Sequence, residues 1–175
     1  MVFDWDDFHE TNHKLHRLWE LKRVNPLFRC TMFAVPGLGS DDFWAMVPRW
    51  IELAVHGWVH PDPYECLYWT RERMEALLDE EVVRKHFVNG FKAPGWQISD
   101  ACYEVLMERG WWVADQHVED ERRPLGLRVY LHEDGDNWHG HVQDWGSNGI
   151  EETWPQLRAR VEAAREFRFA SELAR

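Results

Sequence analysis

The sequence predicts a single α/β domain, a shortened and irregular (β/α) barrel of about seven strands that spans residues 1–175. Short apolar runs alternate with longer amphipathic segments, which is the pattern of β-α units rather than of a helix bundle or a β-sandwich. Repeated alternation implies parallel strands with right-handed crossovers, in an open doubly wound sheet or a barrel. A complete eight-stranded barrel needs more residues than the 175 of this chain, so we expect an incomplete one.

Seven apolar runs are the predicted strands, and four amphipathic segments are the predicted helices. Thr11 and Thr70 are expected to cap the first two helices, because a threonine oxygen accepts a hydrogen bond from the first turn. Gly110 is expected to end the third helix, since glycine readily adopts the left-handed conformation. The strands cover residues 2–5, 30–35, 52–55, 89–92, 111–115, 127–131 and 138–142, and the helices cover 11–24, 70–86, 99–109 and 152–169.

Composition and charge exclude several classes of protein. The 20 basic and 31 acidic residues give a formal charge of −11, so we expect no nucleic acid partner, which would need a broad basic surface. No apolar run approaches the roughly eighteen residues of a membrane span, and the chain does not begin like a secretory signal. We therefore expect a cytoplasmic protein without a membrane partner. Cys30, Cys66 and Cys102 are far apart, and we expect buried free thiols.

Asp6 and Asp7 follow the first predicted strand directly. The carboxyl ends of parallel strands are where α/β enzymes place their catalytic groups. Two neighbouring carboxylates at such an end can divide the work, with one binding a metal ion and the other acting as a base. Taken alone, the pair is equally consistent with a solvated turn or a helix cap.

His56 and His60 follow the third predicted strand and are four residues apart. On one turn of helix, both rings would point the same way and chelate one divalent ion. With Asp7 as the third ligand, one position stays open, as catalytic metal sites require. Zinc is the expected ion, and nickel, cobalt and iron suit the same ligands. A histidine pair at this spacing also occurs without a metal.

The segment from Lys92 to Trp96 interrupts the fourth predicted strand at a Pro-Gly pair. One interpretation is an ordinary turn with the indole packed on the core. The other is a rigid wall of the substrate pocket, where the charge of Lys92 tunes the nearby carboxylates. In that interpretation the substrate-binding residues are Lys92, Pro94, Gly95 and Trp96.

His139 and His141 lie in the last predicted strand. Histidine titrates near neutral pH, so an imidazole at the mouth of a strand can protonate a departing amine. We expect only one of the two to face the site. His141 is favoured as the general acid, and His139 is the alternative.

These motifs, in this order, resemble those of the polysaccharide deacetylase family (NodB homology, carbohydrate esterase 4). The resemblance runs from about residue 2 to about residue 145 and implies the NodB-like deacetylase fold with one divalent metal ion. Trp5-Asp6-Asp7-Phe8 resembles the family's Phe-Asp-Asp-Gly, which implies Asp6 as the general base and Asp7 as a metal ligand. The segment from His56 to Pro61 resembles its His-x-x-x-His motif, which implies two histidine ligands.

The remaining motifs resemble the family with departures. Lys92-Ala93-Pro94-Gly95 is similar to its Arg-x-Pro groove motif, with lysine in place of arginine. The strand that ends at Asp115 is similar to the one that supplies a carboxylate near the general-acid histidine, which implies that Asp115 orients that imidazole. Phe8 stands where the family has glycine, and Trp-His-Gly-His replaces a Leu-x-His pattern.

The predicted function is metal-dependent removal of an N-acetyl or O-acetyl group from a carbohydrate or related small amide. Asp6 would take a proton from the attacking water, and His141 would give one to the leaving amine. Two alternatives stay open. His9, Glu10 and His13 fit the HExxH signature of zinc metalloproteases, although only eight residues precede it. The chain can also be a catalytically silent carbohydrate-binding domain of the same fold.

Overall fold

Seven parallel strands form one sheet in the computed structural model, which describes residues 1–116, 122–132, 136–143 and 148–175. The order across the sheet is β6-β5-β4-β3-β2-β1-β7, and every neighbouring pair is parallel. All seven predicted strands are confirmed within a few residues. They are β1 (Phe3–Phe8), β2 (Cys30–Ala34), β3 (Ile51–His56), β4 (Gly90–Lys92), β5 (Trp112–Asp115), β6 (Arg128–Leu131) and β7 (Trp138–His141).

The helices lie in the connections between strands. Two of them begin or end at other residues than predicted. The first begins at Leu15, after a Lys14 N-cap, rather than near Thr11. The predicted helix 70–86 starts after a Thr70 cap as expected but divides at Glu80, where the backbone is extended. The helices of the first four connections are α1 (Leu15–Val24), α2 (Asp41–Met46), α3 (Arg71–Asp79), α4 (Glu81–His86) and α5 (Asp100–Glu108), with short 3-10 turns η1 (Pro36–Leu38) and η2 (Pro94–Trp96).

The C-terminal segment is two short helices rather than the single predicted helix 152–169. The first, α6 (Trp154–Ala163), ends early, and the chain then runs extended so that Arg168 pairs with Val2. The second is α7 (Ala170–Leu173). This helix lies at the amino end of the barrel, where Ala170 donates a backbone hydrogen bond to Thr31 and Ser171 contacts the carboxylate of Glu52.

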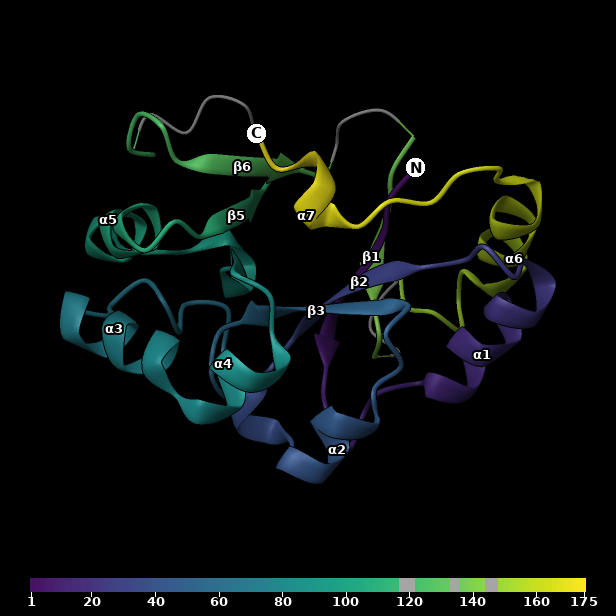
Figure 1. The fold of residues 1–175 in the computed structure, drawn as a ribbon, viewed down its shortest axis with the longest axis horizontal. Helices are drawn as coiled ribbons and strands as arrows, with labels where there is room; N and C mark the ends of the chain where they lie inside the picture. Colours follow the sequence, from purple (N-terminus) through teal and green to yellow (C-terminus); the bar gives the residue numbers. More distant parts are fainter. Residues whose placement is uncertain (117–121, 133–135, 144–147) are drawn as a thin grey trace.

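The sheet curls into an incomplete barrel whose two edges are β6 and β7 (Figure 1). The helices lie outside the curl, with α1 beside α6 on one flank and α3 beside α5 on the other. The predicted fold class, a shortened and irregular (β/α) barrel, is confirmed. Because α7 closes the amino end, the open mouth is at the carboxyl ends of the strands, where (β/α) barrels place their sites.

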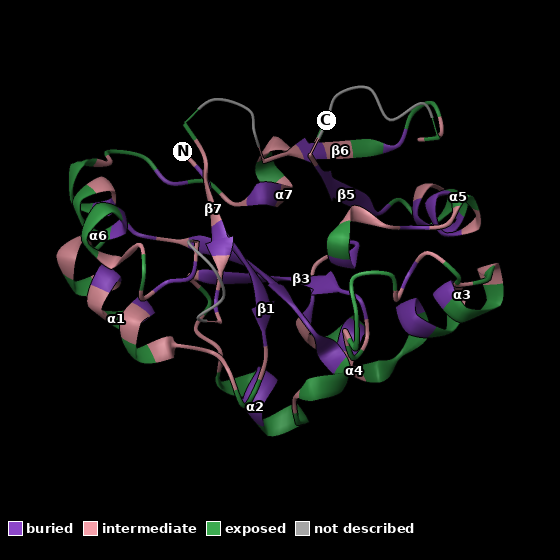
Figure 2. Ribbon diagram, turned by 180° about the vertical axis from the view of Figure 1, so that it is seen from behind, coloured by how far each residue is buried: buried purple, intermediate pink, exposed green. Residues whose placement is uncertain are grey.

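Side chains of each strand alternate between the two faces of the curled sheet. On the outer face, Phe3 and Trp5 join the large core beneath the helices. On the inner face, Phe33, Trp112 and Tyr130 belong to a second, smaller core. Strands β1 to β5 are buried along their length, whereas the edge strands β6 and β7 are partly exposed and the helices expose one side (Figure 2). The interior of the barrel is therefore packed, and polar side chains of the inner face collect at the mouth.

The described residues contain no helix long and apolar enough to cross a membrane. Cys30, Cys66 and Cys102 are buried free thiols, as predicted. Burial raises the pKa of all three. These cysteines therefore stay protonated near neutral pH and serve as small core residues.

Candidate active site

A bulge at the end of β1 brings two consecutive carboxylates to the same mouth of the barrel. Strand alternation directs Asp4 and Asp6 to the inner face, and the next residue would ordinarily point outward. Asp7 instead adopts a left-handed backbone conformation with a φ of 64°, and the register with β2 shifts between Trp5 and Phe8. Aspartate visits this conformation more readily than most residues, and a bulge redirects a side chain.

Asp7, His56 and His60 form a candidate metal site. Oδ1 of Asp7 lies 3.6 Å from Nε2 of His56 and 3.2 Å from Nε2 of His60. One ligand atom from each of the three residues lies within 4.8 Å of the other two. Ligands of a tetrahedral zinc ion lie about 2 Å from the metal and therefore about 3.4 Å from one another. The structure thus brings the three predicted ligands together at separations that fit a shared ion.

Neighbouring groups orient the ligand atoms toward that shared point. Nδ1 of His56 lies 3.0 Å from the carbonyl oxygen of Lys92. Since a carbonyl only accepts, Nδ1 carries the proton and Nε2 is left to bind a metal. Gln143 donates an amide hydrogen bond of 2.7 Å to Oδ2 of Asp7, which leaves Oδ1 facing the imidazoles. Burial lowers the pKa of His56, although the two aspartates oppose it, and so favours the neutral imidazole that binds metals.

The carboxylate of Glu65 holds the loop that carries His60. It accepts hydrogen bonds of 3.0, 3.1 and 3.0 Å from the backbone N–H groups of Trp58, Val59 and His60. The loop also requires Gly57, whose φ is 65° and where a Cβ would clash with the Glu65 carboxylate. The two histidine rings therefore converge through a tight loop, and the prediction that they share a turn of helix is wrong.

Glu65→Ala is expected to weaken metal binding by about 10–100-fold, because removing a group that orders a metal ligand typically has this effect. The three amides would lose their shared acceptor, and His60 would lose its fixed position. Zinc affinity measured by competition with a chelating dye checks this. Glu104→Ala, at an exposed position of α5, should bind zinc like the unaltered protein. Equal affinity in Glu65→Ala would show that the loop keeps its shape without this carboxylate.

Lys92 holds Asp6 as an ionised carboxylate next to the candidate metal site. The ammonium Nζ lies 2.7 Å from Oδ1 of Asp6, and the Lys92 side chain is 1% exposed. The ring of Trp96 covers the ammonium at 4.1 Å. Burial alone would raise the pKa of Asp6, but Lys92 and the surrounding imidazoles hold that pKa well below its usual range. Nε2 of His56 lies 4.0 Å from Oδ2 of Asp6, so the charged carboxylate adjoins the candidate metal ligands.

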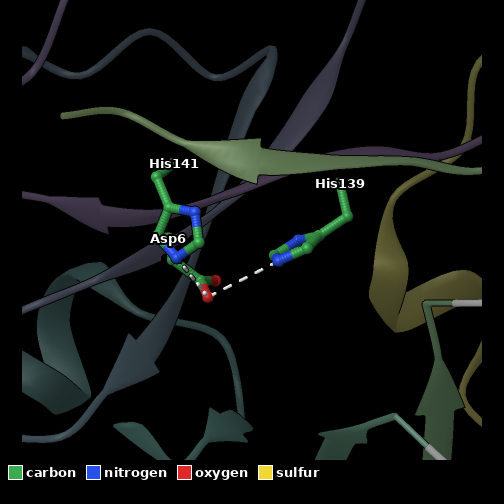
Figure 3. Close-up of side chains that lie close together, drawn as sticks. All are labelled: Asp6, His139 and His141. Carbon is green, nitrogen blue, oxygen red and sulfur yellow. Dashed lines mark ion pairs between the residues drawn. The ribbon is translucent and has the colours of Figure 1, made fainter. Parts of the chain in front are cut away.

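Both histidines of β7 point toward Asp6 (Figure 3). Nε2 of His139 lies 3.7 Å and Nε2 of His141 lies 3.9 Å from Oδ2 of Asp6. The prediction that only one of them faces the site is wrong, because residues two apart on a strand lie on the same face. The parallel register of β1 and β7 places His141 beside Asp6 and His139 beside Asp4.

Asp6, His139 and His141 also place three ligand atoms within 4.8 Å of one another. A positive charge is already present there, since Nζ of Lys92 lies 2.7 Å from Asp6 and 3.4 Å from Nε2 of His139. A second cation in the same place would be repelled by the ammonium group. This cluster therefore suits proton transfer better than metal binding.

The predicted pocket wall follows β4 directly. Pro94 and Gly95 form the turn η2, and Trp96 takes a left-handed conformation with a φ of 61°. Non-glycine residues in this region cluster at functional sites, and here Asp7 and His60 share the property. The indole lies on Lys92 and stacks on the imidazole of His132 at 4.8 Å. Contact of this wall with substrate stays a prediction.

Asp115 does not join the two imidazoles of β7. Asp115 lies on the same face of β5 as Val113, and Val113 packs in the large core outside the curl. Its carboxylate accepts the backbone N–H of Gln116 at 2.6 Å and lies 3.6 Å from Nε of Arg123. The carboxylate next to His139 is instead Asp4, whose Oδ1 lies 2.6 Å from Nδ1 of the imidazole.

The HExxH segment lacks the helix that its zinc chemistry requires. His9 and Asn12 form an isolated bridge before α1, so the two histidines are not on successive turns of one helix. Glu10 accepts the backbone N–H of Ser40 at 2.8 Å, and Nδ1 of His13 accepts that of Leu15 at 3.1 Å. The segment thus organises the start of α1, and the metalloprotease alternative loses its structural basis.

Three residues of the site were not predicted from the sequence. Asp4 offers the clearest signal, because a charged residue two positions before Asp6 in an apolar strand must face the same side. Gln143 follows the carboxyl end of β7, and functional residues of (β/α) barrels commonly lie at the carboxyl ends of strands. Glu65 gives no local signal, since only the folded loop shows that it binds backbone amides.

Comparison with solved structures identifies the fold. No family model matches the sequence, and no curated protein sequence matches it. A family 4 acetyl xylan esterase from Clostridium thermocellum, solved with a cobalt ion, has a TM-score of 0.64 to this chain at 17% identity, covering 98% of this chain and 88% of that one. The chain has the fold of the family 4 carbohydrate esterases. The resemblance predicted from the motifs is thus confirmed at the level of the fold.

Two further structures show the range of proteins with the family 4 carbohydrate esterase fold. The chitin deacetylase of Colletotrichum lindemuthianum has a TM-score of 0.61 at 14% identity, over 99% of this chain and 86% of that one. A family 4 pseudoenzyme from Bacillus anthracis has a TM-score of 0.58 at 12% identity, over 98% of this chain and 64% of that one. The fold therefore supports both active and inactive proteins, and function depends on the site.

Proposed function

We propose that the chain is a metal-dependent hydrolase that removes an N-acetyl or O-acetyl group from a carbohydrate or a related small amide. One observation carries the proposal: Asp7, His56 and His60 converge beside a second carboxylate, Asp6, that a buried lysine keeps ionised. Similar solved structures include an acetyl xylan esterase and a chitin deacetylase, so acetylated carbohydrates are the first substrates to test.

The chain's own groups can be assigned complementary roles around one divalent ion. Asp7, His56 and His60 would hold the ion, with zinc expected and nickel, cobalt or iron as alternatives. When bound, the ion supplies Lewis acidity that polarises the acyl carbonyl and acidifies water. Asp6 accepts the proton of the attacking water, since it is ionised and has no proton of its own to release. An imidazole of β7 protonates the departing amine.

A cavity of about 390 Å³ adjoins the metal ligands on the side of the His60 loop. Small-molecule sites commonly enclose about 300–1,000 Å³, so the cavity has room for the part of a substrate next to the acyl group. Its lining mixes apolar and polar side chains, which suits a sugar ring with its hydroxyl groups. The lining residues include Asp7, His9, Val35, Leu38, His60 and Asp62.

His56→Ala is expected to lose stoichiometric metal and most of its hydrolase activity, because a buried ligand atom is removed from the centre of the site. Metal analysis and acetate release from a panel of N-acetylated sugars check this. His13→Ala is the matched control, since this imidazole accepts the backbone N–H of Leu15 at the start of α1 and does not belong to the assigned ligand set. The control should keep both metal and activity. Loss of metal in His13→Ala, or full activity in His56→Ala, would contradict the assigned ligand set.

A catalytically silent protein of the same fold is the second candidate, because a pseudoenzyme is among the similar structures. Against it, Asp6 keeps both its charge and its place beside the metal ligands. Absence of acetate release across the panel, together with tight binding of the same sugars, would favour the silent alternative.

A further inference from the structure

A chain of side-chain contacts runs from Tyr130 through Asp4, His139 and Lys92 to Asp6, the proposed base. The hydroxyl of Tyr130 donates a hydrogen bond of 2.7 Å to Oδ2 of Asp4. The other oxygen of Asp4 lies 2.6 Å from Nδ1 of His139. Asp4 is fully buried, and a carboxylate in such a place needs donors for its lone pairs. Asp4 therefore accepts one hydrogen bond from the hydroxyl of Tyr130 and one from the imidazole of His139.

These contacts define the tautomer of His139. An ionised carboxylate only accepts hydrogen bonds, so Nδ1 of the imidazole carries a proton. On the other side, Nε2 lies 3.4 Å from Nζ of Lys92, and an ammonium group only donates. Nε2 must then present its lone pair, which makes His139 a neutral imidazole protonated on Nδ1.

His141 has different surroundings, although it lies on the same face of β7. Its Nδ1 lies 3.2 Å from Oδ1 of Asn148, a neutral acceptor. Its Nε2 lies 3.9 Å from Oδ2 of Asp6, which is beyond hydrogen-bond distance. The ammonium group of Lys92 contacts Nε2 of His139. In the contacts that the structure describes, Nδ1 of His139 thus faces a carboxylate and Nδ1 of His141 faces a neutral amide oxygen.

We propose that Asp4 and Tyr130 fix His139 as a neutral hydrogen-bond acceptor that holds the ammonium of Lys92 against Asp6. Asp4, Tyr130 and His139 are then positioning residues that act through Lys92, and His141 is the imidazole that remains to protonate the leaving group. The assignment of His141 rests on the proposed hydrolase function. The state of His139 does not, because it follows from hydrogen-bond partners alone.

The tautomer can be read without any activity measurement. Long-range ¹H–¹⁵N correlation spectra of the histidine-labelled protein should show His139 neutral and protonated on Nδ1. In Asp4→Asn, the amide oxygen accepts from Tyr130 and the amide N–H₂ faces the imidazole, so the proton should move to Nε2. Asp79→Asn, at an exposed residue paired with Arg109, should leave the spectrum unchanged. A His139 protonated on Nε2 or on both nitrogens in the unaltered protein would overturn the proposal.

Kinetics on two substrates separates positioning from proton donation. An acetamide substrate needs its leaving amine protonated, whereas an aryl acetate releases a good leaving group unaided. His141→Leu should lower kcat for the amide by about 10²–10⁴-fold and for the aryl ester far less. His139→Leu should lower kcat by about 10–100-fold for both, in the range found for orienting groups. His139→Gln should recover part of that loss, because its amide oxygen can accept from Lys92.

The opposite pattern would overturn the proposal. If His139 donates the proton, then His139→Gln is as damaging as His139→Leu, and both losses shrink on the aryl ester. Failure of the proposed function is distinguishable from this outcome. A protein that hydrolyses neither substrate would contradict the hydrolase assignment, while the spectra of His139 would still decide whether Asp4 fixes its tautomer.

Discussion

Asp6→Asn is expected to lower kcat for acetate release by about 10²–10⁴-fold, the usual contribution of a positioned base. The ionised carboxylate lies 4.0 Å from Nε2 of His56, a proposed metal ligand, where it can take a proton from a water held between them. An asparagine has nearly the same shape, but its amide oxygen is a far weaker base. The kcat of both proteins, measured on the same N-acetylated sugar, checks the prediction.

Metal content and stability are the controls for this substitution. The asparagine oxygen can still accept a hydrogen bond from Lys92, and the assigned ligands Asp7, His56 and His60 are unaltered. The variant should therefore bind zinc and melt close to the unaltered protein. Asp42→Asn, at an exposed position of α2, should keep full activity. Normal turnover in Asp6→Asn would remove this carboxylate from the mechanism.

The fold was predictable because its strands have simple signals. Apolar runs of β2 and β3 stand out between amphipathic segments, and their buried side chains occupy both faces of the sheet. Helix ends were less predictable. Nothing local marks the break at Glu80, and α6 ends where the chain turns to pair Arg168 with Val2, a contact between opposite ends of the sequence.

The candidate metal ligands were predictable because each lies at or just beyond the end of an apolar strand. What the sequence could not show is how they converge. Two consecutive aspartates face one mouth only because Asp7 is left-handed, and no glycine marks that position. The histidines converge through a loop that Glu65 ties together with three amide hydrogen bonds. Such partners become visible only when the loop is folded.

The cluster around Asp6 shows where the sequence interpretation failed. His139 and His141 lie on one face because a strand has a period of two, so both reach Asp6. The partner carboxylate was assigned to Asp115 through the family resemblance, whereas Asp4 fills that place beside His139. The contact joins the first and the last strand of the sequence, β1 and β7, and the sequence does not show that these two strands are neighbours in the sheet.

Lys92→Met is expected to lower the free energy of unfolding by about 3–5 kcal/mol at neutral pH, the cost of breaking a buried ion pair from one side. Methionine fills much of the lysine volume between Phe33 and Trp96, but it leaves Asp6 charged, 5% exposed and without its main partner. Urea unfolding checks the value. Lys85→Met removes an ion pair of similar length, 2.6 Å to Asp41, at the exposed surface, and should change stability little.

The pH dependence gives this prediction a second test with a definite sign. In the unaltered protein the pKa of Asp6 is lowered, so its stabilising contribution is present above the ordinary aspartate pKa and is lost as the pH falls. Without Lys92, burial should raise that pKa, and ionisation then destabilises the variant as the pH rises. The stability gap between the two proteins should therefore widen from pH ~4 to pH ~7. A gap that stays constant would mean that the lysine acts through packing rather than through its charge on Asp6.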